Sequence, residues 1–311
     1  MRAAQIDSYG DHTAIQVREV ARPAPGAGQV VIEVHASGIN PFDGIVLAGW
    51  MADQMPLAFP ATLGGDFAGV VAELGEGVGN LAVGDPVFGG QANTLFGGSG
   101  ALAEFVAVPA DKVAKAPGGI DLALAAALPL AGVTAVQVLR DELRLTAGER
   151  ILIHGASGNV GAAAVQIAKH LGATVVGTAS AGAHSRVLAL GADQVVDYSP
   201  EGLAGLTADF DAIFDASSVG PDAVLGVARA GGRVVSMTSA PDAGVVAERE
   251  LLASQSFTVI TAEKLNALRG LVETGVVTPH VAASYPLGDA AEAFRAKLSG
   301  EIHGRVALLP R

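Results

Sequence analysis

The stretch from Ile151 to Gly177 constrains the fold of this chain more than any other part of its sequence. Ile151–Ile153 is a short apolar run, as expected for a strand that is buried on both faces. A glycine-rich turn follows, then a helix-forming segment over Ala162–Leu171, and a second apolar run begins at Thr174. A strand, a glycine turn, a helix and a strand within about thirty residues are the context that makes a dinucleotide-binding fingerprint credible.

The glycine turn predicts where the pyrophosphate of a dinucleotide binds. Glycines allow a tight turn and a close approach of the backbone, and the N–H groups at a helix N-terminus accept negative charge. An ordinary strand–turn–helix with incidental glycines is the alternative, and the flanking strands and helix disfavour it. The residues that we expect to hold the pyrophosphate are Gly155, Ala156, Ser157, Gly158, Asn159, Val160 and Gly161.

The end of the second strand predicts NADPH rather than NADH. An NAD site usually carries Asp or Glu there to bind the ribose 2′-hydroxyl, but this sequence has no carboxylate between Gly177 and Asp193. Ser180 can donate a hydrogen bond, and His184 and Arg186 can supply positive charge to a 2′-phosphate. For Arg186 the alternative of a solvated helix residue stays open.

Composition excludes several classes of function. The chain has 311 residues, enough for two domains, and a net charge of −12, which argues against nucleic acid and anionic membranes as partners. It has no cysteine, so disulfides, thiolate catalysis and thiolate zinc sites are excluded. With no signal peptide and no long uninterrupted apolar stretch, we expect a cytoplasmic protein that does not bind membranes.

The order of expected elements divides the chain into two domains. Residues 1–118 contain short strands separated by glycine and proline turns, which suggests a barrel-like β domain. Strands and helices alternate over residues 119–278, which predicts a doubly wound parallel sheet (Rossmann fold). Residues 279–311 read as β again, apart from one helix, so we expect them to return to the first domain. The strands expected in the second domain are 151–153, 174–177, 194–197, 212–215, 233–237 and 258–260.

Several motifs in the same order resemble those of the zinc-independent branch of the medium-chain dehydrogenase/reductase superfamily, the quinone oxidoreductases. The resemblance covers nearly the whole length. It rests on Ala36–Asp43, Gly64–Val71, Val83–Gly89, Ala101–Phe105, the glycine turn and the final Gly304–Val306. It implies a chaperonin-10-like β domain together with a Rossmann domain that binds NADPH.

The resemblance also implies that this chain lacks the catalytic zinc site of the alcohol dehydrogenases. Those relatives place a Cys ligand where Asn40 stands and a His ligand where Gly65 stands. Without zinc there is no Lewis acid to activate an alcohol, so the expected activity is hydride transfer from NADPH to an acceptor that is already electrophilic, a quinone or an α,β-unsaturated carbonyl. The alternatives are reduction of another activated alkene or aldehyde, and a non-catalytic, crystallin-like or regulatory NADPH-binding protein.

Further site residues follow from strand ends and from the resemblance. Asn40 and Asp43 are the candidates for the substrate side: Asn40 could hydrogen-bond a carbonyl on which charge develops. The alternative for both residues is a tight turn, and for Asp43 this alternative is favoured. Protonation of the product by water is expected, because no general acid stands out. The other residues expected near the cofactor are Asn40, Thr134, Tyr198, Ser217, Thr238, Ser239 and Arg305.

Further expectations concern side-chain packing and assembly. Trp50, Met51, Met55 and Phe59 could form an apolar lid, with core packing as the simpler reading, and His154 is expected to be a satisfied packing histidine. Relatives commonly pair the edge strands of their nucleotide domains, so we expect a homodimer, with the edge at Phe257–Thr261.

Overall fold

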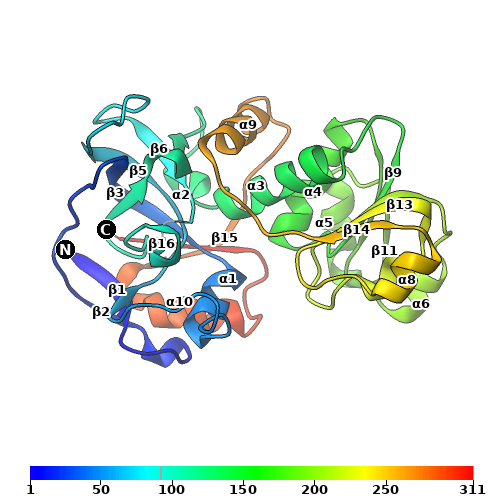
Figure 1. The fold of residues 1–311 in the computed structure, drawn as a ribbon, viewed down its shortest axis with the longest axis horizontal. Coiled ribbons are helices and arrows are strands. Elements are labelled where there is room, and N and C mark those ends of the chain that lie inside the picture. Colours follow the sequence, from blue (N-terminus) through cyan, green and yellow to red (C-terminus); the bar gives the residue numbers. More distant parts are fainter. Residues whose placement is uncertain (92, 311) are drawn as a thin grey trace. The chain divides into compact units, whose positions relative to one another are not determined.

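The computed structural model describes residues 1–91 and 93–310, and the chain forms two compact units (Figure 1). Unit 1 comprises Met1–Leu130, Ile260–Glu273 and Pro279–Arg311. Unit 2 comprises Ala131–Val259 and Thr274–Thr278. Unit 1 is therefore assembled from segments that are far apart in the sequence.

Unit 2 is built on a parallel sheet with the strand order β11-β10-β9-β12-β13-β14. Its strands are β9 (Arg150–His154), β10 (Thr174–Thr178), β11 (Gln194–Val196), β12 (Phe210–Asp215), β13 (Ala228–Ser236) and β14 (Leu252–Gln255). Leu152 of β9 belongs to the apolar cluster on one face, whereas Ile151 and Ile153 point to the other face by the alternation of a strand. All three side chains are fully buried, which confirms the prediction of a sheet that is covered on both faces.

Helices cover both faces of this sheet (Figure 1). Those that follow the strands are α4 (Asn159–His170), α5 (His184–Ala189), α6 (Pro200–Ala204), α7 (Asp222–Leu225) and α8 (Ala243–Glu248). Leu203, Val224 and Val245 bring α6, α7 and α8 to one apolar cluster, while α4 packs on β9 and β10. α3 (Pro129–Val136) precedes β9 and continues as a π-helical turn over Gln137–Glu142. Among the described residues, no helix combines the length and the apolar character that crossing a membrane requires.

Unit 1 is a β domain with two sheets in its described part. A small sheet has the order β2-β1-β4, and a larger one has the order β15-β16-β3-β5-β6-β8 with β7 paired to β3. The strands are β1 (Arg2–Ile6), β2 (Gln16–Glu19), β3 (Gln29–Ile39), β4 (Ala61–Thr62), β5 (Asp66–Leu74), β6 (Pro86–Gly89), β7 (Phe105–Pro109), β8 (Val113–Lys115), β15 (Val281–Pro286) and β16 (Arg305–Leu309). Neighbouring strands are antiparallel, apart from the parallel pair β15 and β16.

The last segment of the chain, Pro279–Arg311, belongs to the first unit. β16 pairs antiparallel with β3, and the Arg2 guanidinium donates to the carbonyl of Pro310 at 2.6 Å, so the two chain ends lie side by side (Figure 1). α10 (Ala290–Leu298) buries Phe294 in the cluster that contains Ile39 of β3 and Val306 of β16. This cluster fixes β16 and therefore places Arg305, its first residue.

Two helices that we expected in the nucleotide domain at 119–278 belong to unit 1 instead. α2 (Leu122–Ala125) packs on β3 and β5, and α9 (Ala262–Glu273) packs on β8. Leu265 and Leu268 of α9 are fully buried. The apolar faces of these two helices pack on the β domain. The alternation of strands and helices along the sequence does not show on which domain a helix packs.

The structure corrects one local prediction and excludes one alternative. Residues 41–48 form helix α1 (Pro41–Ala48), not a tight turn: Asn40 is its N-cap, Pro41 opens it and Asp43 is its third residue. Residues 258–260 are not a strand, because side-chain amides take their backbone N–H groups: Val259 donates to Gln137 Oε1 at 3.0 Å and Ile260 donates to Gln91 Oε1 at 3.2 Å. The strand at this edge of the sheet is β14, and β11 lies at the other edge.

The role of Phe294 predicts a large effect on stability. Phe294→Ala removes a fully buried ring between α10 and β16, and we expect the free energy of unfolding to fall by about 3–5 kcal/mol. Val83→Ala, at a side chain that is 64% exposed, is the control and should change it by less than about 0.5 kcal/mol. Denaturant unfolding followed by circular dichroism measures both, and similar unfolding midpoints for the two variants would contradict the assignment of the core.

Candidate functional sites in the two units

The glycine turn of unit 2 joins the end of β9 to the start of α4. Gly155 has φ +83°, and a Cβ there would lie 2.8 Å from Ser217 Cα. A Cβ at Gly161 would lie 2.7 Å from Ala156 Cα, so packing requires both glycines. At Gly158 the nearest atom to such a Cβ is 3.4 Å away, and this residue is exposed. The fold does not require Gly158 to be small, so its open surface is left for a ligand.

The N-terminus of α4 gives this turn an affinity for anions. Gly158 is its N-cap, and no acidic residue stands in its first turn. The N–H groups of the first turn of a helix have no partner within that helix, and the helix dipole adds positive potential. The turn can therefore bind a phosphate or pyrophosphate group.

A buried hydrogen-bonded pair, His154 and Thr178, holds the start of the glycine turn. Thr178 Oγ1 accepts the N–H of Gly155 at 3.0 Å and lies 2.7 Å from His154 Nδ1. If the Thr178 hydroxyl donates to Nδ1, the proton of a neutral His154 sits on Nε2. That Nε2 is buried and has no hydrogen-bond partner among the described residues, so the prediction of a satisfied packing histidine was wrong. Burial lowers the pKa of His154, while the neighbouring Asp215 opposes this shift.

Asp215, at the end of β12, joins two further strand ends. It is fully buried, and its carboxylate accepts hydrogen bonds from the hydroxyls of Ser217 at 2.6 Å, Ser236 at 2.7 Å and Thr238 at 2.8 Å. Ser239 donates its N–H to Ser236 Oγ at 3.3 Å. Ser217, Thr238 and Ser239, which we expected near the cofactor, therefore lie together at the carboxyl ends of β12 and β13.

The residues expected to hold a 2′-phosphate follow β10. Ser180 is exposed, and His184 Nε2 donates to the carbonyl of Ala179 at 3.1 Å. The guanidinium of Arg186 donates to the carbonyl of Ser157, which brings this side chain to the glycine turn.

Asp197, which follows β11, was not among the predicted site residues. Its carboxylate accepts the N–H of Ser199 at 2.8 Å. The hydrogen bonds from Ser199 lower the pKa of Asp197 most, and the positive charge of His184 adds to this shift. A carboxylate beside His184 therefore competes with a 2′-phosphate for the charge of that histidine.

Three other expected cofactor residues lie in different surroundings. Thr134, on α3, is buried, with its Oγ1 2.6 Å from Thr258 Oγ1. Tyr198 is 53% exposed, so it is not a half-buried strand residue. Arg305 is buried in unit 1, so it is not a surface cation.

Unit 1 contains a buried cluster of charged and polar side chains. Asn40 donates from its backbone N–H to Asp43 Oδ2 at 2.7 Å and from Nδ2 to Asp66 Oδ2 at 3.0 Å. Arg305 donates to Asn40 Oδ1 and lies 3.6 Å from Asp66 Oδ2. Leu130 donates its N–H to both Asp66 oxygens. These four side chains, Asn40, Asp43, Asp66 and Arg305, are each at most 3% exposed, and we call them the Arg305 cluster.

Burial governs the ionisation of the Arg305 cluster. It raises the pKa of Asp43 to about 7, with the charge of Asp66 adding to the shift and Arg305 and backbone N–H groups opposing it. It also raises the pKa of Asp66 and lowers that of Arg305. With Asp43 protonated, the negative charge of Asp66 balances the guanidinium, so the buried cluster is neutral. Sequence reasoning missed Asp66, although it lies in the Gly64–Val71 motif.

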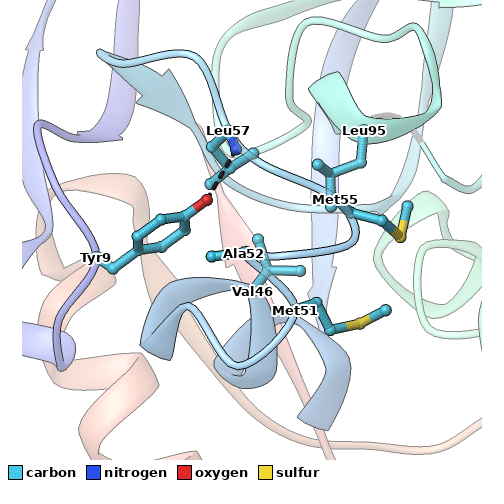
Figure 2. Close-up of a pocket in the computed structure, with 7 residues that line it drawn as sticks. All are labelled: Tyr9, Val46, Met51, Ala52, Met55, Leu57 and Leu95. Carbon is cyan, nitrogen blue, oxygen red and sulfur yellow. Dashed lines mark hydrogen bonds between the residues drawn. The ribbon is translucent and has the colours of Figure 1, made fainter.

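The loop after α1 forms a small apolar pocket that Tyr9 closes (Figure 2). The Tyr9 hydroxyl accepts the N–H of Leu57 at 2.8 Å, and its ring meets Phe59 edge-on. Met51 and Met55 line this pocket, whereas Trp50 is 78% exposed. The four residues of the expected lid therefore split between pocket lining and surface. The lining residues are Tyr9, Val46, Met51, Ala52, Met55, Leu57 and Leu95.

Comparison with known proteins identifies the family. Residues 26–118 match the alcohol dehydrogenase GroES-like domain, which confirms the predicted chaperonin-10-like domain, and residues 190–308 match the family described as zinc-binding dehydrogenase. The chain is 32% identical over 327 residues to the chloroplast envelope quinone oxidoreductase homolog of Arabidopsis thaliana, covering 100% of this chain and 98% of that protein.

Two further proteins agree with this assignment. The NADPH-dependent alkenal/one oxidoreductase of Arabidopsis thaliana chloroplasts is 33% identical over 323 residues, covering 100% of this chain and 80% of that protein. The crystal structure of Escherichia coli quinone oxidoreductase complexed with NADPH superimposes with a TM-score of 0.86 at 28% identity, with 100% of both chains covered. This chain therefore belongs to the quinone oxidoreductase family of the medium-chain dehydrogenase/reductase superfamily.

Proposed function

We propose that this protein is an NADPH-dependent oxidoreductase that transfers hydride to a quinone or an α,β-unsaturated carbonyl without zinc. The observation that carries the proposal is the glycine turn, where packing requires Gly155 and Gly161 but leaves Gly158 open. The relatives named above as quinone and alkenal/one oxidoreductases support the class of reaction. Bound NADPH would supply the hydride.

The residues of unit 2 fit an NADPH molecule. The backbone of the turn from Gly155 to Gly161 would hold the pyrophosphate, and Arg186, with Ser180, would meet the 2′-phosphate. Asp193, the first carboxylate after β10, is bound to Lys169 at 2.8 Å and to the N–H of Val175 at the start of β10. It is therefore at the wrong end of the strand to hold a ribose.

The Arg305 cluster does not fit a zinc ion. The side-chain amide of Asn40 accepts from Arg305 and donates to Asp66, so its oxygen is already occupied beside a guanidinium. Gly65 offers no side chain, and among residues 1–91 and 93–310 no group of three or more His, Asp and Glu side chains is placed to hold a metal. Since zinc prefers nitrogen and sulfur ligands, this donor set does not suit it. The proposed acceptors are electrophilic without a metal.

The position of Arg186 predicts a change in cofactor preference. Arg186→Ala removes a cation that would pair with the 2′-phosphate, and an exposed pair contributes up to about 1 kcal/mol, so Kd for NADPH should rise about fivefold. Kd for NADH should stay unchanged. Fluorescence titration measures both constants, with Arg140→Ala, another exposed arginine of unit 2, as the control. Equal weakening of both cofactors would contradict the assignment.

Because the side chains of the Arg305 cluster do not suit zinc, we predict that removing metal ions with a chelator leaves activity intact. Oxidation of NADPH with 1,4-benzoquinone should have the same kcat before and after dialysis against EDTA, and added Zn²⁺ should not raise it, because the donors do not suit zinc. Absorbance at the NADPH band follows the reaction. Loss of turnover that Zn²⁺ restores would refute zinc independence. NADPH binding without oxidation by benzoquinone or an enone would favour the alternative of a non-catalytic binding protein.

We propose that the protein forms a homodimer through β14, an edge strand of the unit 2 sheet. This strand pairs with β13 on one side only, and Leu252 is 68% exposed. An open edge with an exposed apolar side chain is a template for pairing with a second copy about a two-fold axis.

The edge at β14 gives a test of assembly. Leu252→Lys places a charge on the edge in each copy, so light scattering should change from twice the chain mass to a single chain mass. Val83→Lys, at an exposed position in unit 1, should remain a dimer. A wild-type protein that scatters as a monomer would show that the proposed interface does not form.

A further inference from the structure

Asp197 brings a carboxylate to the loop that follows β10. Strands β10 and β11 run parallel with Thr178 opposite Val196, and Ala179 donates its N–H to the carbonyl of Val196 at 3.0 Å. Asp197, the next residue after Val196, therefore lies beside the start of this loop. The loop itself, residues 179–183, contains no carboxylate. The neighbouring strand thus supplies in space a group that the loop lacks in sequence.

The Asp197 carboxylate is bound to both segments around it. It accepts the N–H of Ser199 at 2.8 Å and the hydroxyl of the same serine, and it also accepts the N–H of Ala181 from the loop after β10. An ionised carboxylate has about four sites that accept hydrogen bonds, so these donors do not use its full capacity. Asp197 is partly exposed, and a ligand at the loop can therefore reach its oxygen atoms.

The charges at this loop are of mixed sign. Hydrogen bonds from Ser199 lower the pKa of Asp197 most, and the charge of His184 adds to this shift, so the carboxylate is ionised at neutral pH. His184 and Arg186 are the cations that we expect to bind a 2′-phosphate, and the guanidinium of Arg186 reaches the carbonyl of Ser157. A single carboxylate in this set offsets part of its positive charge.

A carboxylate at this position distinguishes the two forms of the ribose. It accepts a hydrogen bond from a 2′-hydroxyl, which is neutral and can donate, whereas it repels a 2′-phosphate, which is negative and has no hydrogen to donate when ionised. Sites for NAD usually place such a carboxylate at the end of the second strand of the fold. Here the carboxylate comes from the end of the third strand instead.

Resting on the proposed nucleotide site, we propose that Asp197 is a specificity-determining residue that accepts the ribose 2′-hydroxyl of NADH and opposes the 2′-phosphate of NADPH. Arg186 attracts the 2′-phosphate and Asp197 repels it, so the preference for NADPH is small and NADH is a second cofactor. The missing carboxylate in the loop sequence, which led us to expect NADPH, is therefore only half of the electrostatic balance.

Asp197→Asn tests this role with little change in shape. The amide keeps an oxygen that can accept the Ser199 N–H, but it removes the negative charge. For the wild type we expect Kd values for NADPH and NADH within about tenfold of each other. In the variant, Kd for NADPH should fall about fivefold and Kd for NADH should rise about fivefold, as for one exposed charged contact. Fluorescence of the reduced nicotinamide follows both titrations.

Asp141→Asn is the matched control, because it removes the same charge at an exposed position of another element of unit 2. It should leave both constants unchanged. Calorimetric titration with adenosine 2′,5′-bisphosphate and with 5′-AMP repeats the comparison without a nicotinamide ring. Asp197→Asn should bind the bisphosphate more tightly and 5′-AMP more weakly than the wild type does.

The outcomes separate this role from a structural one and from the proposed reaction. Equal weakening of NADPH and NADH in Asp197→Asn, with a lower unfolding midpoint, would show that Asp197 only supports the loop and would overturn the proposal. Unchanged constants, or a wild type that binds NADPH and not NADH, would overturn it as well. The expected opposite shifts without turnover of benzoquinone or an enone would support the role of Asp197 and refute the reductase function. A wild type that binds neither nucleotide would overturn both.

Discussion

The buried contact between Arg305, Asp66 and Asn40 is the interaction on which unit 1 depends. It joins the first residue of β16 to the first residue of β5 and to the N-cap of α1. Removing one partner of a buried ion pair leaves an uncompensated charge and is unfavourable by about 3–5 kcal/mol. The three segments are therefore coupled, and the side of α1 that carries Asp43 is fixed relative to Gly65. The same residues that hold the chain end in place set the electrostatics of the candidate substrate site.

Unit 2 follows the same physical rule, through hydrogen bonds to a threonine hydroxyl and to a buried carboxylate. Thr178 and Asp215 lie at the carboxyl ends of parallel strands, where they satisfy hydroxyl and backbone N–H groups from neighbouring turns. Because a buried polar group without a partner is unfavourable, these contacts fix the turns that follow β9, β12 and β13. Buried polar contacts thus hold the glycine turn in place. Among the polar atoms of these contacts, Nε2 of His154 has no hydrogen-bond partner in the described part of the chain.

The sequence predicted local features well where one short stretch carries all the information. The strand, glycine turn and helix at 150–170 are an example, since their apolar spacing and glycines act within a few residues. Prediction failed where distant groups compete for the backbone. The apolar run at 258–260 has the composition of a strand, but Gln137 and Gln91 bind its N–H groups. A tight turn was the alternative considered for Asn40 and Asp43, whereas the structure shows a helix N-cap and the third residue of that helix, with Asn40 hydrogen-bonded to Asp66 of β5 and Arg305 of β16.

The sequence by itself determined the family, the glycine turn and the lack of thiolate ligands, because each depends on residue types or their local order. Only the tertiary structure decided what Asp43 can do. Its pKa depends on burial and on Asp66 and Arg305, and Asn40, which links them, lies 265 residues from Arg305 in the chain. Likewise, the polar surroundings of Gly65 come from Asp43, Gln91 and Asn93, which lie on separate segments of the chain. Desolvation and charge act through distance in space, and the order of residues along the chain does not contain that distance.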